Sequence, residues 1–555
     1  MRETSRLALV RIALFGLSGL CANAFAQPKD GTNPPNVPAT VPSVTGANPC
    51  ERLATPNLAD ADGKSIDFAR IADAPTHVMS AKIVDAANDV PAFCHVIGYV
   101  SPSVGIELRL PMTAWNGKFA EVGCGGMCGG IQAPGCESAL IKGYACVMSD
   151  MGHRGTQIDA AWGYNNLQAK IDFGYRATHV AALAGKFITR VFYGQDPRLS
   201  YFIGCSTGGR QGLISAQRFP YDFDAILAGA PPMNEIGDGL DILWSVKAAA
   251  NADGTPLMKS TDLALVTKAV LKQCDMDDGV LDGVVGDPRR CAFDPRKLIC
   301  KAGEKTDQPA SCLQPAQAEA LRKIYAGPHD AKGRRWYYGI MPGSEPVWVG
   351  SLQRDDGQVS HYQAFMTSMF RFLNFMPDAG PLWTPAQFNW EEDPKRLDLV
   401  EALFNAQNPD LRRFKAAGGK LLLFHGWNDH IVQPEATVDY YETVERTMGG
   451  RAQTQDFFRL FMAPGVNHCQ SGTGAYAVDW LGALEDWVEK GRAPDRILAV
   501  RPKELAGGLY PRFFTPVPGV MDNAIFSRPL FPYPVRAIYS GAGDPSRADS
   551  FKEAR

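Results

Sequence analysis

The sequence predicts an α/β protein whose mostly parallel sheet is interrupted by a large inserted domain. Three observations support this fold class. Short apolar segments bounded by Gly, Pro or Asp alternate with amphipathic helical patterns along much of the chain. A Gly-x-Ser-x-Gly motif stands where one of these apolar segments passes into a helical pattern. The alternation stops between about residues 233 and 407 and resumes afterwards.

The apolar segments have the length and composition of buried strands. Amphipathic helices are predicted between some of them, at 175–192 and 207–219. Such alternation is typical of a parallel sheet that helices cover on both faces. The six predicted strands are 106–110, 143–148, 201–203, 225–228, 420–424 and 457–462.

Residues 233–407 follow a different pattern. They contain four cysteines, a cluster of aspartates and many aromatic side chains. A chain of 555 residues also exceeds what one compact core usually accommodates. We therefore interpret this segment, called the lid below, as a second domain inserted at a surface loop of the first. The sheet domain would then consist of residues 49–232 and 408–555.

The N-terminus has the features of a secretory signal peptide at residues 1–26. Three arginines precede an apolar run at 12–20, and Ala24-Phe25-Ala26 places small residues where signal peptidase reads them. Cleavage before Gln27 would leave a flexible leader, rich in Pro, Asn, Thr and Gly, at 27–48. The alternative is an ordinary buried helix. We expect an exported protein, secreted or periplasmic.

Charge and hydropathy narrow the range of partners. The net charge of −3 gives no long-range attraction to nucleic acid or anionic lipid. No segment after the signal reaches the roughly 18 uninterrupted apolar residues that a membrane-spanning helix needs. We expect a small ligand, no nucleic-acid partner and no membrane contact after signal cleavage. The sequence does not indicate an oligomeric state.

The candidate nucleophile is Ser206, at the centre of a Gly-Cys-Ser-Thr-Gly motif at 204–208. An apolar strand precedes the motif and an amphipathic helix follows it, which is the context of the nucleophile elbow of α/β-hydrolases. Glycines are needed there because the serine stands at a sharp corner where larger neighbours would collide. The alternative is a tight glycine-rich turn without catalytic function.

A catalytic serine needs a base, and the base needs an acid that orients it. In α/β-hydrolases the acid and then the histidine follow the serine along the chain. Asp429 follows the strand 420–424 and His468 follows the strand 457–462, so both stand in loops at strand ends. Other histidines fit less well, since His425 precedes the acid and His430 adjoins it. A solvated loop histidine is the alternative for His468.

Two backbone amides should bind the oxyanion of the tetrahedral intermediate. One is that of Thr207, the residue after the nucleophile. The other should come from a glycine-rich loop after an early strand, and residues 123–130 form such a loop upstream of the serine. Gly125 and Gly126 are the candidate donors. The alternative is that these glycines serve only a turn.

Removal of Cys21 with the signal peptide leaves twelve cysteines, and an exported chain can keep them as disulfides. Cys205 precedes the proposed nucleophile and Cys469 follows the proposed base. If the serine and the histidine are within hydrogen-bonding reach, these cysteines must lie close together, and a disulfide between them would hold the two loops in place. Zinc is disfavoured because no His/Cys pair follows Cys124 and Cys128 at finger spacing.

The chain resembles the tannase and feruloyl esterase family of secreted α/β-hydrolases, which includes mono-(2-hydroxyethyl) terephthalate hydrolases. The matching elements are residues 204–212, the loop of Asp429, and Asn467-His468-Cys469. The resemblance implies an α/β-hydrolase domain with a large inserted lid, and the bonded cysteine pair beside the serine and histidine. It also implies the disulfides Cys50–Cys94, Cys274–Cys291 and Cys300–Cys312. The order of pairing among Cys124, Cys128, Cys136 and Cys146 stays open.

The resemblance further implies a structural Ca²⁺ site in the lid and no organic cofactor. Residues 275–284, called the calcium loop below, match the family's motif. Ca²⁺ takes six to eight oxygen ligands, which closely spaced aspartates on a flexible loop can supply. The loop is no EF-hand, since Gly286 occupies the place of the required Glu. The alternative is a solvated acidic loop. The expected ligands are the carboxylates of Asp275, Asp278 and Asp282 and the backbone carbonyls of Val280 and Val284.

The resemblance implies substrates that are esters of aromatic acids, with lid aromatics stacked on the acyl ring. In the terephthalate monoester branch a lid arginine reads the free carboxylate. Met369 stands at that position here, which weighs against this branch, although Arg371 two residues later could substitute for the arginine. We therefore expect a serine esterase for hydroxycinnamic, gallic or related acids. The alternatives are a terephthalate monoester hydrolase, a hydrolase of other esters or peptides on the same fold, and a non-catalytic phenolic-binding module.

Overall fold

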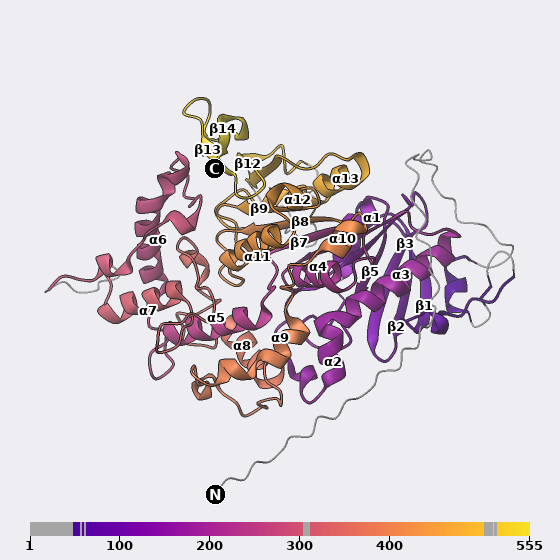
Figure 1. The fold of residues 1–555 in the computed structure, drawn as a ribbon, viewed down its shortest axis with the longest axis horizontal. Coiled ribbons are helices and arrows are strands. Elements are labelled where there is room, and N and C mark those ends of the chain that lie inside the picture. Colours follow the sequence, from indigo (N-terminus) through magenta and orange to yellow (C-terminus); the bar gives the residue numbers. More distant parts are fainter. Residues whose placement is uncertain are drawn as a thin grey trace, which may run out of the picture. The chain divides into compact units, whose positions relative to one another are not determined.

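Nine strands form one sheet, in the order β1-β2-β3-β5-β4-β6-β7-β8-β9, which extends from the centre of the view to its right side (Figure 1). The computed structural model describes residues 48–55, 58–59, 63–131, 133–302, 311–503, 514 and 519–555. The predicted signal peptide at 1–26 and nearly all of the leader at 27–48 lie outside the described residues. Residues 38–555 form one compact unit.

The sheet has an antiparallel end and a parallel remainder. β1 (Thr76–Val84), β2 (Phe93–Val100) and β3 (Val104–Pro111) pair antiparallel, and β3 pairs antiparallel with β5 (Ala145–Ser149). The other neighbours are all parallel. Their strands are β4 (Lys118–Val122), β6 (Leu199–Cys205), β7 (Ala225–Gly229), β8 (Lys420–Gly426) and β9 (Phe458–Ala463). A mostly parallel α/β sheet is thus confirmed.

All six predicted strands are present, with small differences at their ends. β5 begins at Ala145 instead of 143, because Gly143 has φ of +82° and belongs to the preceding turn. β1, β2 and β4 were not among the predicted strands. β1 is an edge strand with many exposed positions, so it lacks the apolar run by which the buried strands are found.

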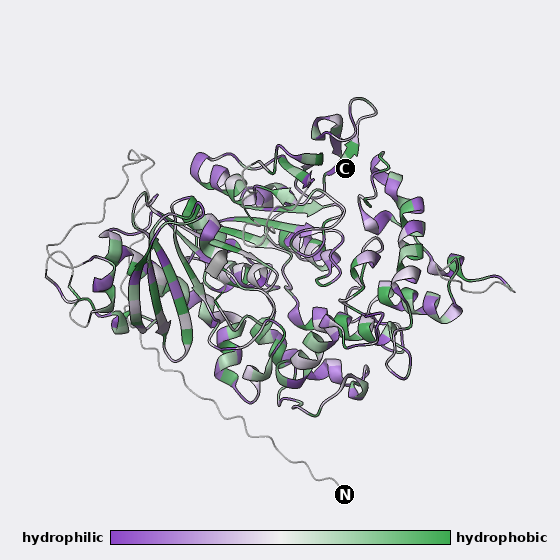
Figure 2. Ribbon diagram, turned by 180° about the vertical axis from the view of Figure 1, so that it is seen from behind, coloured by the Kyte–Doolittle hydropathy of each residue, from purple (hydrophilic) through white to green (hydrophobic). Residues whose placement is uncertain are grey.

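Helices cover both faces of the sheet. α3 (Ala177–Tyr193) and α4 (Thr207–Arg218), close to the predicted 175–192 and 207–219, pack on one face. α13 (Trp480–Lys490) and α1 (Glu137–Ile141) pack on the other face. Alternate side chains of β6 enter the two cores: Phe202 joins the core under α3 and α4, and Tyr201 joins that under α13. Figure 2 shows the hydrophobic colouring of these central strands.

The described residues of the lid form helices and a few isolated β-bridges, and none of them forms a named β-strand. These helices lie between β7 and β8 in the sequence and occupy one side of the view in Figure 1, coloured magenta to orange. The boundaries at 233 and 407 stay a prediction. The main helices are α5 (Glu235–Ala248), α6 (Ser260–Cys274), α7 (Pro315–Ala326), α8 (His361–Phe372) and α9 (Asp398–Phe404).

Beyond β8 the chain adds α11 (Pro434–Thr447) and two small antiparallel sheets that the sequence patterns did not predict. β10 (Ala477–Val478), β11 (Ile497–Pro502) and β12 (Ala524–Leu530) form one, and β13 (Arg536–Tyr539) and β14 (Phe551–Ala554) the other. Within the described part of the chain, no helix is both long and apolar enough to cross a membrane.

Six disulfides join the twelve cysteines from Cys50 to Cys469. Four of the pairs are those expected above: Cys50–Cys94, Cys205–Cys469, Cys274–Cys291 and Cys300–Cys312. The pairing that the sequence left open is Cys124–Cys128 and Cys136–Cys146.

Candidate active site

Ser206 is the single residue between β6, which ends at Cys205, and α4, which begins at Thr207. Its backbone has φ of +62° and ψ of −131°, a conformation that a residue with a side chain rarely adopts. A Cβ added to Gly204 would lie 2.5 Å from the carbonyl carbon of Gly208, so the corner requires glycine there. The Ser206 amide donates to the Gly229 carbonyl of β7 at 2.9 Å, which ties the corner to the neighbouring strand.

The structure brings the three predicted triad residues together. His468 Nε2 lies 2.8 Å from Ser206 Oγ, and His468 Nδ1 lies 2.7 Å from Asp429 Oδ2. Asp429 stands in the loop after β8 and His468 in the loop after β9, and these strands are neighbours. Because β6, β8 and β9 run parallel within the sheet, their carboxyl ends lie at the same edge. The loops that follow β8 and β9 therefore start beside the corner that carries Ser206.

The disulfide Cys205–Cys469 closes the corner of the serine onto the loop of the histidine. Its Cα atoms are 6.0 Å apart although 264 positions separate the two cysteines. Cys469 has φ of +63°, so the loop turns sharply directly after the histidine. The two segments therefore meet as expected, and the covalent bond limits how far Ser206 and His468 can separate.

Asp429 is fully buried and accepts hydrogen bonds on both carboxylate oxygens. Oδ1 accepts from the backbone amides of Ile431 and Val432, at 2.9 and 3.1 Å. Burial by itself would raise the pKa of Asp429, but the charge of His468 and the hydrogen bonds from His425 and His468 bring it far below its ordinary value. The carboxylate is thus ionised and holds the proton of His468 on Nδ1, which leaves Nε2 free to accept a proton from the serine.

His425, which precedes the acid in the sequence and does not fit as the base, is part of the site through its contact with Asp429. Its buried ring approaches Asp429 Oδ2 with Nε2 at 3.0 Å, and the same nitrogen lies 3.1 Å from the Val432 carbonyl. Both neighbours are acceptors, so Nε2 carries the proton, and Nδ1 accepts from Thr437 Oγ1 at 2.7 Å. The four-residue spacing between His425 and Asp429 was the available indication.

His430, and His153 from before the serine in the sequence, are both buried and neutral. Burial lowers the pKa of His430 to about 4, and its Nε2 lies 3.2 Å from the Tyr362 hydroxyl of α8. Burial likewise lowers the pKa of His153 to about 4. Its ring stacks on Trp162 with centroids 3.6 Å apart, and its Nε2 donates to the Met127 carbonyl at 2.7 Å. His153 therefore supports the glycine-rich loop.

The glycine-rich loop at 123–130 lies against the first turn of α4. Thr207 Oγ1 donates to the Gly126 carbonyl at 2.8 Å. Within the described part of the chain, the amides of Thr207, Gly125 and Gly126 donate no hydrogen bond. These free amides beside Ser206 are of the kind that an oxyanion requires. Which of the two glycines would donate stays a prediction.

Sequence comparison identifies the family. Residues 88–554 match the family described as tannase and feruloyl esterase. The chain belongs to this family.

Relatives within the tannase and feruloyl esterase family are similar along most of the chain. An uncharacterized esterase of Xanthomonas campestris is 33% identical over 521 residues, covering 86% of this chain and 87% of its own length. Mono(2-hydroxyethyl) terephthalate hydrolase of Piscinibacter sakaiensis is 32% identical over 566 residues, covering 89% and 90%. The crystal structure of feruloyl esterase B from Aspergillus oryzae matches with a TM-score of 0.74 at 28% identity, covering 86% and 97%.

The calcium loop that resemblance to the tannase family implied has suitable donors. Burial raises the pKa of Asp278 to about 6, and the neighbouring charges of Asp282 and Asp275 add to the rise. Such mutual repulsion is what a bound cation would relieve. Within the described residues, the carbonyls of Val280 and Val284 accept no hydrogen bond. Cys274–Cys291 closes the loop as expected.

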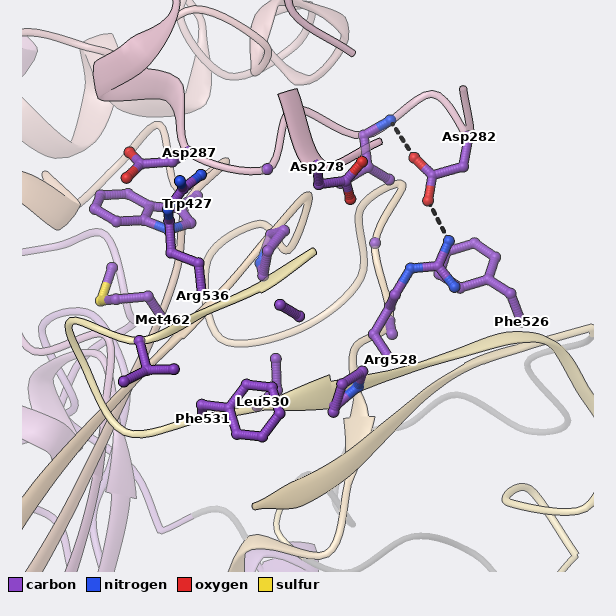
Figure 3. Close-up of a pocket in the computed structure, with 18 of the residues that line it drawn as sticks. Asp278, Asp282, Asp287, Trp427, Met462, Phe526, Arg528, Leu530, Phe531 and Arg536 are labelled. Carbon is purple, nitrogen blue, oxygen red and sulfur yellow. Dashed lines mark hydrogen bonds and ion pairs between the residues drawn. The ribbon is translucent and has the colours of Figure 1, made fainter. Parts of the chain in front are cut away.

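The positions of these donors do not form a closed metal site. Among the described residues, no three His, Cys, Asp or Glu side chains are grouped closely enough to hold a metal ion. Arg528 of β12 pairs with the carboxylate of Asp282 (Figure 3), and Asp275 accepts from the amides of Asp282 and Gly283. The donor chemistry thus fits Ca²⁺, but Asp282 would have to exchange Arg528 for the ion.

A small cavity of about 50 Å³ lies beside the calcium loop (Figure 3). Asp278 and Asp282 line one side, and Trp427, Met462 and residues of β12 line the others. As far as the described residues show, the triad side chains are not part of its lining. It is therefore separate from the catalytic centre, and its polar lining combines the calcium loop with Asp287 and the arginines Arg289, Arg528 and Arg536.

Of the two residues that bear on substrate choice within the tannase family, Met369 is buried and Arg371 is partly exposed. Met369, at the position of the lid arginine, is 2% exposed and packs in the core. Arg371 Nε donates to the Trp383 carbonyl at 2.8 Å. The aromatic residues Phe370 and Trp383 stack on each other with centroids 5.4 Å apart and are buried. These two rings stabilise the lid.

Proposed function

We propose that this carboxylic ester hydrolase is an exported serine esterase that cleaves esters of aromatic acids through an acyl-enzyme. The observation that carries the proposal is the continuous hydrogen-bonded chain from Ser206 Oγ to His468 and on to Asp429, with distances of 2.8 and 2.7 Å. A nucleophile, a base and an orienting acid in this geometry are what acyl transfer requires.

In the first half of the reaction, His468 Nε2 takes the proton of Ser206 as Oγ attacks the ester carbonyl. The negative oxygen of the tetrahedral intermediate accepts hydrogen bonds from the Thr207 amide and from Gly125 or Gly126. The intermediate collapses when His468 gives its proton to the leaving alcohol. Ser206 then carries the acyl group as an ester.

In the second half, His468 takes a proton from water while the water oxygen attacks the acyl carbonyl. A second tetrahedral intermediate uses the same amides. Its collapse returns the proton to Ser206 Oγ and releases the acid. Asp429 stays ionised throughout and stabilises the imidazolium of His468 at each step.

The aromatic-acid substrate class rests on the family and on the lid. One relative is named a mono(2-hydroxyethyl) terephthalate hydrolase, and one matching solved structure is named a feruloyl esterase. An esterase that reads a terephthalate carboxylate would need a free cation there. Met369 is apolar and buried, and Arg371, two residues later, donates its Nε–H to the Trp383 carbonyl. We therefore favour uncharged phenolic esters and keep terephthalate monoesters as the alternative.

Export and calcium complete the proposal. The six disulfides favour an oxidising compartment, secreted or periplasmic. Ca²⁺ would be held by the carboxylates of Asp275, Asp278 and Asp282 with the carbonyls of Val280 and Val284. Its contribution would be to stabilise the lid, because none of these residues is in the reaction steps above.

The test compares wild-type protein with Ser206→Ala on methyl ferulate, methyl gallate, mono(2-hydroxyethyl) terephthalate and a short aliphatic ester. We expect the first two to have the highest kcat/KM and Ser206→Ala to lose all four activities. If Ser206→Ala hydrolyses these esters at the wild-type rate, the assignment of Ser206 as the nucleophile is wrong. Preference for the terephthalate ester selects the alternative substrate, and binding without an acyl-enzyme burst selects the non-catalytic module.

A further inference from the structure

The disulfide Cys124–Cys128 closes a five-residue ring within the glycine-rich loop beside the nucleophile. Its Cα atoms are 5.5 Å apart, and the ring encloses both candidate oxyanion donors, Gly125 and Gly126. The Cys128 amide donates to the Gly125 carbonyl at 3.0 Å, so the same residues also form a tight turn. A covalent bond and a turn hydrogen bond thus constrain one short segment.

The backbone of this segment adopts conformations that need support. Gly126 has φ of +57° and Gly129 of +81°, which glycine tolerates. Cys128 has φ of +56°, where a residue with a Cβ is unfavourable and persists only if its surroundings hold it. The bond to Cys124 supplies such a restraint. Without it, two adjacent glycines would have wide conformational freedom.

The ring is attached to the first turn of α4. Gln211 Nε2 donates to Cys124 Sγ at 3.1 Å, and Thr207 Oγ1 donates to the Gly126 carbonyl at 2.8 Å. The contact is close along the backbone, since a Cβ on Gly208 would lie 3.2 Å from the Cys124 carbonyl oxygen. The far side of the ring is held by Met127, whose amide donates to the Gln157 carbonyl at 2.9 Å.

We propose that Cys124–Cys128 is a positioning element for the oxyanion donor of the glycine-rich loop. This inference rests on the proposed serine esterase function. The disulfide would hold a free glycine amide at a fixed place relative to the Thr207 amide. Donors placed before the reaction stabilise the tetrahedral oxyanion without reorganisation, and displacing one weakens the transition state more than the bound ester.

The test replaces both cysteines, Cys124→Ser with Cys128→Ser. The matched control is Cys136→Ser with Cys146→Ser, which removes another short, buried disulfide from the same half of the chain. For the test variant we expect kcat to fall about 10- to 100-fold with KM within about 2-fold. Affinity for phenylboronic acid should fall in parallel, because its serine adduct places an oxygen in the oxyanion position. The control should keep both values.

Equal kcat and boronate affinity in the test and control variants would overturn the proposal. If the test variant does not fold, Thr207→Val in the intact chain removes the hydroxyl that ties Gly126 while keeping the Thr207 amide. A parallel loss of kcat and boronate affinity then supports the positioning role, and wild-type affinity overturns it. Ser206→Ala separates the two levels: if it still hydrolyses ester, the proposed function fails whatever the cysteine variants do.

Discussion

His425 and Asp429 meet inside the protein, with His425 Nε2 3.0 Å from Oδ2 of the carboxylate. The same oxygen lies 2.7 Å from Nδ1 of His468, so one oxygen atom receives two imidazole N–H groups. The ring of His425 is held in turn by Thr437 of α11. The orientation of the triad acid therefore depends on a buried histidine that takes no part in proton transfer.

This relationship predicts that His425→Phe lowers kcat about 10- to 100-fold while KM changes little, because Oδ2 loses one of its two imidazole donors and a carboxylate held mainly through Oδ1 positions His468 less well. His425→Gln should recover much of the loss, since its amide nitrogen can reach a place near that of Nε2. Steady-state kinetics on one aromatic ester checks both variants. Wild-type kcat in the phenylalanine variant would contradict the positioning role.

The second prediction concerns pH and a buried carboxyl of the lid. Burial, followed by the charges of Glu235 and Asp241, raises the pKa of Asp238 well above its ordinary value. The Gln433 amide donates to Asp238 there. The folded protein thus keeps a proton that the unfolded chain releases above about pH 4, so this group costs stability increasingly as pH rises. Asp238→Asn should therefore raise Tm at pH 8 more than at pH 4.

The amide oxygen of the asparagine can still accept from the Gln433 amide, which lies 3.3 Å from Asp238 Oδ1 in the wild type. Asp456→Asn is the control, because the side chain of Asp456 is 68% exposed. Melting curves at the two pH values provide the measurement. A gain in Tm that is the same at both, or a loss at pH 8, would rule out a buried protonated Asp238.

The third prediction is that Ca²⁺ raises Tm and that EGTA reverses the rise. At a concentration 100 times Kd, binding would add about 2.7 kcal/mol to the free energy of unfolding. Asp278→Asn should weaken the effect because it removes the negative charge of one of the expected ligands. Asp277→Asn is the matched control, since Asp277 is in the same loop but pairs with Arg290 and Arg536. Insensitivity of the wild-type Tm to Ca²⁺ would reject the site.

The fourth prediction compares two disulfides. Loop-closure entropy assigns about 5 kcal/mol to a bond that spans 264 positions, as Cys205–Cys469 does, and about 3 kcal/mol to one that spans 12, as Cys300–Cys312 does. Paired serine substitutions at the first should lower Tm more and should also lower kcat. Those at the second should leave kcat unchanged. Chemical denaturation and steady-state kinetics of the two double variants check this prediction. If kcat is unchanged in both variants, Cys205–Cys469 does not hold the Ser206–His468 geometry.

Much of the fold follows from local patterns in the sequence. Buried strands such as β6 and β7 are short apolar runs, and the corner at Ser206 is marked by glycines that its backbone requires. The position of an edge strand is harder to predict from the sequence, because an exposed strand such as β1 needs no apolar run. The two small C-terminal sheets were missed as well.

By itself the sequence determined which residues could form a catalytic triad, their order, and the meeting of Cys205 with Cys469. Those conclusions needed only neighbours along the chain and one family pattern. The pairing of Cys124 with Cys128, the approach of His425 to Asp429 and the contact of Arg528 with Asp282 were decided by the tertiary structure. The physical reason is that residues without a periodic pattern are partnered by whichever side chains the packed elements bring within a few ångströms, and sequence spacing does not record that distance.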